Sequence, residues 1–380
     1  MTLSLFQQII KVLPRRRIGE FVAIHESDKW TKQFATFDHL VVMIYAQLSG
    51  QARLRDLGAS FNASPARHYH LGGKAVKRST LSDANAARPT GVFEAILGYP
   101  LDGMAAQGHK PIGELIQLLD STTLSLFART HKAMRFRSNN SAIKLHLLFD
   151  PDAQCPTWFQ ITPARLHDSR LCESLALTAG ATDVFDRAYN KAEFWTDIDA
   201  ADASFVTRPK SNLAYDVQHS RLHPNSFIVA DETIVLAGQP GRKYTKPLRR
   251  IEIFDEDRGR ELAFITNDFD RSAEQIAALY KRRWQIELFF KWIKQNLKIK
   301  RFLAKNPKAI RLQIITALIA YVLLKILHQQ NRIAMPLKRI AALATNFLYN
   351  VCEINQLIHP PDKKPPPLPQ NQLKLIFPGQ

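Results

Sequence analysis

The sequence predicts an α/β protein, in which a helical N-terminal domain precedes an α/β domain with a mixed sheet and a β-rich insertion. Three patterns support this prediction. Apolar residues recur at helical spacing through about the first 105 residues, and strands alternate with helices from residue 112 onwards. Residues 211–268 then contain alternating strands without a convincing helix. A chain of 380 residues is long enough for two or three domains.

The N-terminal domain is expected to consist of helices. "TFDHLVVMIYAQLSG" (36–50) has the spacing of a helix that ends at Gly50. "ARLRDLGASFN" and "KRSTLSDANAARPTGVFEAIL" are two further expected helices, the second with Ser79 as its N-cap. Lys77 and Arg78 come just before this cap, where the helix dipole already favours an anion, so they suit contact with phosphate. The spacing fits a helix-turn-helix-like reader of DNA, and it also fits an ordinary helical domain with a basic surface.

The α/β domain is expected to begin with three strands, of which the second and third pair around the turn "DPDAQC". A helix with Asp168 or Ser169 as its cap should follow. The expected order is strands at 113–127, 142–150 and 156–164, a helix at 167–180, a strand in 182–189, a helix at 190–200 and a strand at 203–209. Such alternation is typical of a mixed sheet.

A β-rich insertion is expected at about 211–268. "SFIVADETIVLAG" and "RRIEIFDEDRGRELAFITN" alternate as strands do, and the second indicates a hairpin that turns at "DEDRG". Helices should follow from Ser272, at 308–328 and at 335–357. The predicted domains are 1–105 (helical), 106–330 (α/β with its insertion), 331–358 (a C-terminal helical region) and 359–380 (a Pro-rich tail, extended or disordered).

The charge balance points to a polyanionic partner. Lys and Arg number 52 against 34 Asp and Glu, a net charge of +18, and nucleic acid is the usual partner of such a protein. An anionic membrane surface is the alternative, but the basic residues are spread along the whole chain. The apolar stretch 312–327 is shorter than the roughly 20 residues of a membrane span and is expected to be a buried helix. The N-terminus lacks a signal-peptide pattern, and three scattered cysteines indicate neither a disulfide framework nor a zinc site. A cytoplasmic location is therefore expected.

Within the helix from Ser272, the strongly basic and aromatic stretch "YKRRWQIELFFKWIKQNLKIKRF" (280–302) contains one carboxylate, Glu287. At roughly 100° per residue, five polar side chains fall within about 80° of the helix circumference. They are Tyr280, Arg283, Glu287, Lys291 and Lys294. Most of the remaining circumference is apolar and, with Leu288 and Trp292 included, is expected to be buried. The polar stripe should then face a cleft, although simple helix salt bridges of Glu287 with Arg283 and Lys291 are the alternative explanation.

Two aspartates are expected to accompany Glu287. Asp120 lies inside the apolar strand "LIQLLDSTTLS", where an unpaired charge is costly, and Asp186 lies at the end of a short strand in "DVFDRAYN". A strand-end position and a helix cap, respectively, are the alternatives for these two residues. Three carboxylates brought together repel unless a cation neutralises them, and oxygen ligands suit Mg²⁺ or Mn²⁺. Two such ions would support in-line phosphoryl displacement on nucleic acid.

These residues resemble the signature of a known family. Tyr280, Arg283, Glu287 and Lys294 match the Tyr-Arg-Glu-Lys spacing of DDE-type bacterial insertion-sequence transposases. "LLDSTT" and "FDRAY" resemble the blocks around the first and second catalytic Asp of that group, with Ala188 where the family usually has Gly. "STLSDAN" resembles the N-terminal helical domain commonly fused to this core. The resemblance covers about residues 5–350.

The resemblance implies a ribonuclease-H-like (retroviral-integrase-like) catalytic core with a β-rich insertion, preceded by a helical DNA-binding domain. It implies that Asp120, Asp186 and Glu287 are catalytic and bind Mg²⁺ or Mn²⁺, as two ions, for strand cleavage at element ends and strand transfer into target DNA. It further implies DNA contacts by Tyr280, Arg283 and Lys294. Helix geometry adds Lys291, and Arg208 in "VTRPK" and the pair Lys77 and Arg78 complete the expected DNA contacts.

The expected partners are transposon-end and target DNA and a second copy of the chain in a homodimer, without a membrane. The expected location is the bacterial cytoplasm, at the nucleoid when DNA is bound. Two alternatives remain open at this point: a DNA-binding protein with a decayed catalytic core, and a related nuclease that cuts without joining.

Overall fold

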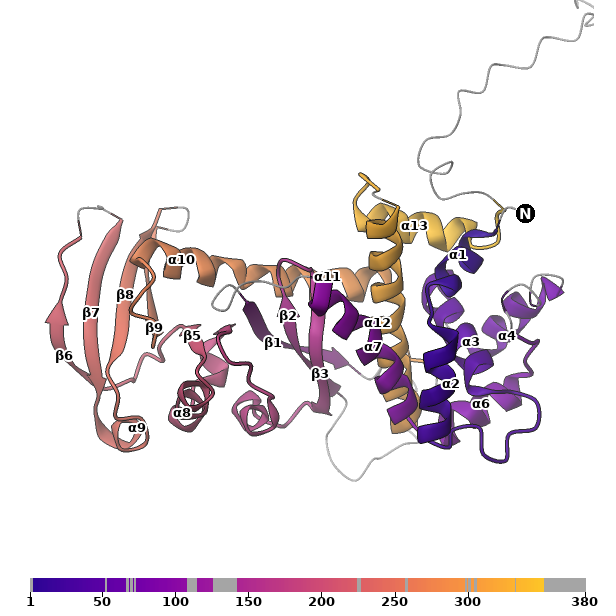
Figure 1. Cartoon of the computed structure of the whole chain (residues 1–380), viewed down its shortest axis with the longest axis horizontal. Coiled ribbons are helices and arrows are strands. Elements are labelled where there is room, and N and C mark those ends of the chain that lie inside the picture. The colour runs from indigo at the N-terminus through magenta and orange to yellow at the C-terminus, as the bar shows by residue number, and fades with distance from the viewer. Residues whose placement is uncertain are drawn as a thin grey trace, which may run out of the picture.

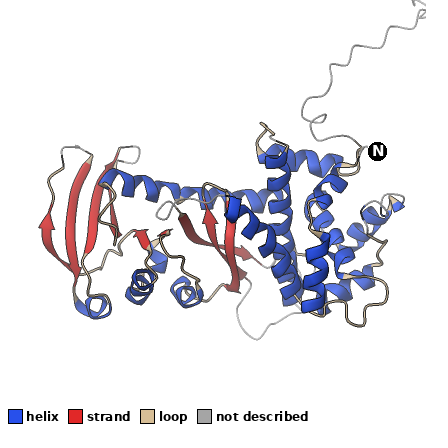
Figure 2. Cartoon of the chain, viewed as in Figure 1, coloured by secondary structure: helices blue, strands red, loops and turns tan. Residues whose placement is uncertain are grey.

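The structure is a computed structural model, and it is elongated, with a helical unit at one end and a sheet at the other (Figure 1). Figure 2 shows the same division by secondary structure. The structure describes residues 3–51, 53–65, 68, 71, 73–107, 115–125, 142–223, 227–256, 259–297, 299, 302–303, 306–331 and 333–351. The predicted Pro-rich tail at 359–380 lies outside these residues.

The helical unit contains the N-terminal helices and two helices from the C-terminal part of the chain. They are α1 (Leu5–Lys11), α2 (Arg15–Ile24), α3 (Thr36–Ser49), α4 (Leu54–Asn62), α6 (Arg78–Ala87), α7 (Gly91–Gln107), α12 (Pro307–Gln330) and α13 (Leu337–Phe347). Helix α3 ends as predicted, because Gly50 adopts a left-handed φ of 78°. The predicted cap at Ser79 is wrong. Helix α6 begins at Arg78, so Ser79 is already its second residue, and Lys77 occupies the cap position without a side-chain bond.

Helix α12 forms the centre of the helical unit. It packs against the next helix, α13, and against α3, α7, α6 and α1, which are far from it in sequence (Figure 1). By length and composition α12 could cross a membrane, but 89% of its most apolar window is buried inside the protein. The predicted buried helix is thus confirmed. The domain boundaries given above remain a prediction.

Within the described residues, the sheet contains nine strands in the order β3-β2-β1-β4-β5-β9-β8-β7-β6. Strand β1 (Ile116–Ser125) pairs in parallel with β4 (Thr182–Phe185), which pairs in parallel with β5 (Ser204–Thr207). Strands β2 (Ala142–Asp150) and β3 (Cys155–Pro163) are antiparallel, as predicted for the turn between them. The sheet is therefore mixed, as the alternation of strands and helices indicated.

The insertion extends this sheet instead of forming a separate one. Its strands are β6 (Tyr215–Ser220), β7 (Ile228–Leu236), β8 (Leu248–Asp255) and β9 (Arg260–Thr266). Strand β9 pairs antiparallel with β5 and with β8, which confirms the predicted hairpin. The structure adds a short helix, α9 (Gly238–Lys243), that was not predicted because "GQPGRK" is rich in helix-breaking residues. Helix α9 packs on α8 (Ala192–Ala200), and the carbonyl of its last residue, Lys243, accepts a hydrogen bond from Thr196.

The predicted helix at 167–180 is wrong. Only Asp168–Ser174 is helical, as a 3₁₀ turn (η2), and neither Asp168 nor Ser169 caps it. The reason is that the Asp168 carboxylate has other partners: Lys144 Nζ lies 2.9 Å from it and Ser121 Oγ 3.4 Å. These contacts hold the Asp168 carboxylate against β1 and β2, and His167 takes the cap position of η2 without a side-chain hydrogen bond.

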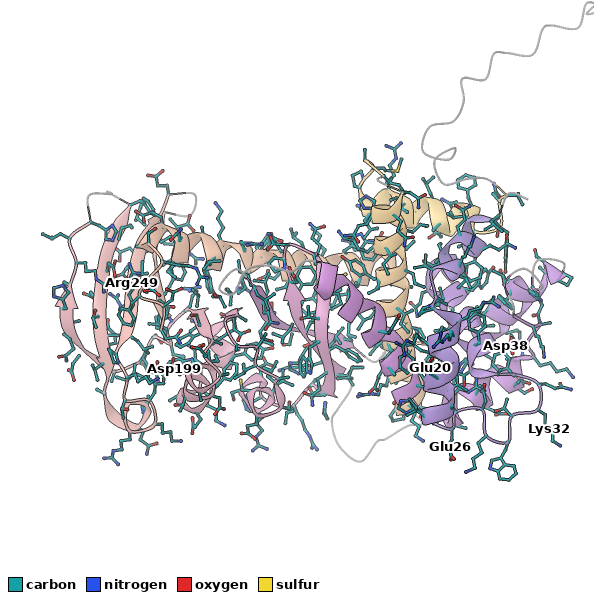
Figure 3. The ribbon with its side chains drawn as sticks, in the orientation of Figure 1. Glu20, Glu26, Lys32, Asp38, Asp199 and Arg249 are labelled. Atoms are coloured by element: carbon teal, nitrogen blue, oxygen red, sulfur yellow. The ribbon has the colours of Figure 1, made fainter. Side chains whose placement is uncertain are left out.

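A buried ion cluster joins the insertion to the next helix, α10 (Ala273–Arg282). Asp231 on β7 is fully buried and accepts hydrogen bonds from Arg249 on β8, with Nε at 2.8 Å and Nη2 at 2.6 Å. His223 and Arg221 reach the same carboxylate at 3.0 Å and 3.4 Å. Arg249, which is labelled in Figure 3, also donates to the carbonyl of Arg271, close to the start of α10. Because each buried charge has a partner, the cluster can hold the insertion against α10.

Asp183 is a second buried charge site, on the central strand β4. Its strand neighbour on β1 is Gln117. Asp183 Oδ2 and Gln117 Oε1 are both buried, and neither has a hydrogen-bond partner in the part of the chain that is described. Burial raises the pKa of Asp183 to about 7. A protonated Asp183 could donate to Gln117, whereas an ionised one would face another acceptor.

Asp183→Asn is expected to stabilise the protein at pH 8 by about 2 kcal/mol and to leave stability at pH 4 unchanged. The folded pKa lies above the unfolded value, so the wild type loses stability as pH rises from about 4 to about 7. An amide does not titrate, so the variant should not show this loss. Thermal unfolding across this pH range, with the exposed Asp197→Asn as control, checks the prediction. Parallel pH profiles for the wild type and Asp183→Asn would contradict it.

Candidate active site

Three carboxylates meet where β1, β4 and α11 (Trp284–Asn296) come together. Leu119 on β1 pairs with Phe185, the last residue of β4, so Asp120 is the next residue of β1 and Asp186 directly follows β4. Glu287 projects from the first turn of α11, which packs on β1. All three line one cleft of about 530 Å³. The structure thus brings together the three residues that the sequence singled out.

The Asp120 side chain is less exposed than that of Glu287, at 19% against 33%. Its Oδ1 accepts a hydrogen bond from the backbone N–H of Ser121 at 2.7 Å. The pKa of Asp120 is raised to about 6, mainly by burial and also by the negative charges of Glu287 and Asp186, against the opposing effects of Ser121 and Arg283. The carboxylates are therefore close enough to repel one another.

Asp186 also serves as a cap, which was the alternative explanation for this residue. Its Oδ1 accepts from the N–H of Arg187 at 2.7 Å at the start of the 3₁₀ turn η3 (Arg187–Tyr189). Ala188 lies in this turn, and it is not among the described non-glycine residues with positive φ. The backbone therefore does not require glycine at this position.

Arg283 lies against two of the carboxylates. Its Nη1 is 3.3 Å from Asp120 Oδ2, and its Nη2 is 2.5 Å from Glu287 Oε1. The guanidinium carbon also lies 5.6 Å from the ring centroid of Tyr280, a cation–π distance. The ion pair with Glu287 is the i,i+4 salt bridge considered as the alternative, but here it shares its cation with Asp120 across the cleft.

The helix from Ser272 is not continuous. Helix α10 ends at Arg282 and α11 begins at Trp284, with bonds to the third preceding residue at the junction: Arg283 N to Tyr280 O, and Ile286 N to Arg283 O. The predicted polar stripe from Tyr280 to Lys294 continues across this break, but its residues line two adjoining clefts. The expected burial of Leu288 is wrong, since it is 48% exposed.

Two lysines complete the first cleft. Lys291 is exposed and lines it, and Glu287 has no ion pair with Lys291 among the described residues. Lys294 donates a hydrogen bond to Thr122 Oγ1, so α11 is tied to β1. Thr122 was not predicted from the sequence, although its position two residues after Asp120 on one strand places both side chains on the same face.

A second cleft, of about 920 Å³, adjoins the first one along α10 and the insertion. Asp186 and Arg283 line both clefts. Tyr280 and Arg208 line the second one, whose wall includes apolar residues of the insertion and the segment before β7: Phe227, Ile253, Leu262 and Phe264. Tyr280 packs on Phe264 with a centroid distance of 4.8 Å. Arg208 therefore faces the cleft region, as the sequence suggested.

Lys77 and Arg78 are not part of this site. Both are exposed at the start of α6, and α6 lies across the helical unit from β1 (Figure 1). Any role of these two residues must be carried out on a separate surface.

The donor set of the cleft fits a hard divalent cation. It consists of carboxylate oxygens that repel one another, and oxygen-only ligation suits Mg²⁺ or Mn²⁺. In the described ranges, however, no group of three His, Cys, Asp or Glu side chains is close enough together to hold a metal ion in the present arrangement. Arg283 supplies the positive charge beside Asp120 and Glu287.

Two families match different parts of the chain. The family described as Transposase DDE domain matches residues 111–323, and one described as Domain of unknown function (DUF4372) matches residues 2–74. The chain is 40% identical over 293 residues to y4zB of Sinorhizobium fredii, named as a transposase, covering 75% of this chain and 81% of that protein. It is 29% identical over 272 residues to a protein of Synechocystis named as a transposase of an insertion sequence element, covering 69% and 75%.

The chain is also similar to a solved structure of the piggyBac transposase synaptic complex with hairpin DNA. The match covers 91% of this chain and 79% of that one, with 9% sequence identity and a TM-score of 0.45. The family match and the y4zB relative establish that the chain belongs to the DDE transposases. It is a DNA transposase, an enzyme of a family in which divalent-metal dependence is general. The Tyr-Arg-Glu-Lys subgroup remains a prediction.

Phe289→Leu is expected to lower the free energy of unfolding by about 1–2 kcal/mol and to slow DNA cleavage, with DNA affinity retained. Phe289 holds α11 in place through Phe149 on β2, at 5.0 Å between ring centroids, and Tyr321 on α12, at 4.8 Å. A loosened α11 would misplace Glu287. Denaturant unfolding and single-turnover cleavage measure the two effects. Leu288→Ala, on the exposed side of the same helix, is the control; an equal loss of stability there would argue against this anchoring.

Proposed function

We propose that Asp120, Asp186 and Glu287 are the catalytic, metal-binding residues of this transposase, and that they hold two Mg²⁺ or Mn²⁺ ions. The observation that supports the proposal is the convergence of three carboxylates from β1, β4 and α11 in one cleft. When bound, such ions activate an attacking oxygen and stabilise a leaving one in phosphoryl displacement. The residues of the chain keep the carboxylates on rigid elements and supply positive charge around them.

We propose that the basic side chains around the carboxylates, together with Tyr280, hold the DNA backbone. Lys291 and Lys294 line the first cleft, Arg208 and Tyr280 line the second, and Arg283 lies between them. Cationic groups on both sides of the carboxylates would place a phosphodiester over them, because phosphate contacts set the register of a protein on DNA. A strand that crosses Asp186 would pass from one cleft to the other.

We also propose that the helical unit binds transposon-end DNA and that two copies of the chain act together on paired ends. Lys77 and Arg78 support the first part: they are exposed at the start of α6, where free backbone N–H groups favour phosphate. The family's reaction, which acts on both ends of an element, supports the second part. The bacterial cytoplasm is the proposed location of this activity.

Glu287→Gln and Asp120→Asn are expected to reduce cleavage of labelled end DNA in Mg²⁺ by about a thousandfold or more while leaving DNA binding intact. Each change removes a carboxylate and adds no bulk. Gel analysis of cleavage and fluorescence anisotropy of binding separate the two activities. Normal cutting by either variant would exclude its metal assignment, and an inactive wild type that binds ends would favour a decayed core.

The double variant Lys77→Ala/Arg78→Ala is expected to weaken binding of end DNA and to reduce the slope of log affinity against log salt by about two, since each lost phosphate contact contributes about 0.9. Cleavage of DNA already bound at saturation should change little, because α6 is remote from the carboxylates. Anisotropy titrations at several salt concentrations give the slope. An unchanged slope would remove both residues from the DNA-binding surface.

A further inference from the structure

Arg283 is the residue whose contacts conflict with its proposed role. A DNA contact requires its guanidinium to face a phosphate. In the structure, however, Nη1 lies 3.3 Å from Asp120 and Nη2 lies 2.5 Å from Glu287. Its Nε is buried and has no hydrogen-bond partner in the described part of the chain, and only 16% of the side chain is exposed. The end of the side chain is thus committed to the two carboxylates.

These contacts and a DNA contact exclude each other. A phosphate that approached Arg283 here would meet the negative charges of Asp120 and Glu287 first, and like charges repel. The same guanidinium also occupies one oxygen of each carboxylate, Asp120 Oδ2 and Glu287 Oε1, so a divalent cation would compete with it for these two atoms. Binding of a DNA phosphate to Arg283, or of a cation to these two atoms, therefore requires Arg283 to move.

The other cations of the cleft do not replace Arg283 as a partner of both carboxylates. Lys294 donates to Thr122, and Lys291 is exposed to water, where its charge is screened. Arg283 stands at the junction between α10 and α11, next to the second cleft that it also lines. A rotation of its side chain towards Tyr280 and Arg208 would keep it within the same groove.

We propose that Arg283 is an internal counter-ion that exchanges with the divalent cation. It pairs with Asp120 and Glu287 while they lack a metal, and it leaves them when they bind one, so that its guanidinium becomes available to a DNA phosphate. Arg283 is then a positioning residue in the metal-free protein and a DNA contact in the loaded one. This inference rests on the proposed metal site. It adds that the cation must bind before Arg283 can contact the DNA backbone.

The first test is metal binding without DNA, measured by calorimetry with Mn²⁺. Arg283→Ala is expected to bind Mn²⁺ about tenfold more tightly than the wild type, because charged hydrogen bonds to the carboxylates no longer compete. Lys291→Ala removes one positive charge from the same cleft without removing a described ion pair, and it should change the affinity by about twofold or less. Arg283→Lys keeps the charge but loses the two-pronged geometry, so its affinity should lie between those of the wild type and Arg283→Ala.

Thermal unfolding gives a readout that does not depend on calorimetry. Without metal, Arg283→Ala leaves the carboxylates without their partner and should melt at a lower temperature than the wild type. Saturating Mn²⁺ should remove most of this difference, so the metal-induced increase in Tm should be larger in the variant. A variant that is merely misfolded would not recover in this way.

The second test is DNA binding by anisotropy, with a duplex that lacks element ends and cannot be cut there. The wild type should bind only slightly better than Arg283→Ala in EDTA and several-fold better in Mg²⁺, whereas the effect of Lys291→Ala should be similar in both. An equal effect of Arg283→Ala in EDTA and Mg²⁺ would overturn the exchange, as would unchanged or weaker Mn²⁺ affinity in that variant. Glu287→Gln distinguishes failure of the proposed metal site from failure of the exchange. If this variant binds Mn²⁺ as tightly as the wild type does, Glu287 is not a metal ligand.

Discussion

The parallel pairing of β1 with β4, covered by α11, is the contact on which the site depends. It places Asp120 on β1 beside Asp186, which directly follows β4, and Glu287 lines the same cleft. The resulting repulsion is a cost that the fold must offset, and Arg283 offsets part of it with two ion pairs. The aromatic packing of Phe289 between β2 and α12 keeps the helix in position against this repulsion.

The insertion contributes to the same site from a distance. Its strands continue the central sheet through β9, and the buried Asp231 cluster connects β7 and β8 with the start of α10. Helix α10 leads directly to Arg283 and α11. The insertion thus provides a wall of the second cleft and also fixes one end of the helix pair that carries Glu287.

Much of the site could be predicted from local sequence because its residues carry strong local signals. A charge within an apolar strand, a polar stripe on an otherwise apolar helix and an aspartate after a short strand each indicated a position, and the structure brings all three together. The errors arose where local signals compete with distant partners. Asp168 does not cap a helix because Lys144 and Ser121 bind it, and "GQPGRK" forms α9 because α8 packs on it.

By itself, the sequence determined the order of elements, the basic character of the protein and the candidate carboxylates, since these depend on residue type and spacing along the chain. Only the tertiary structure decided which charges meet. Arg283 and Asp120 are 163 residues apart, and no periodicity reveals that one guanidinium lies between Asp120 and Glu287. Local geometry fixes the direction of a side chain, but its electrostatic partner depends on how distant elements pack.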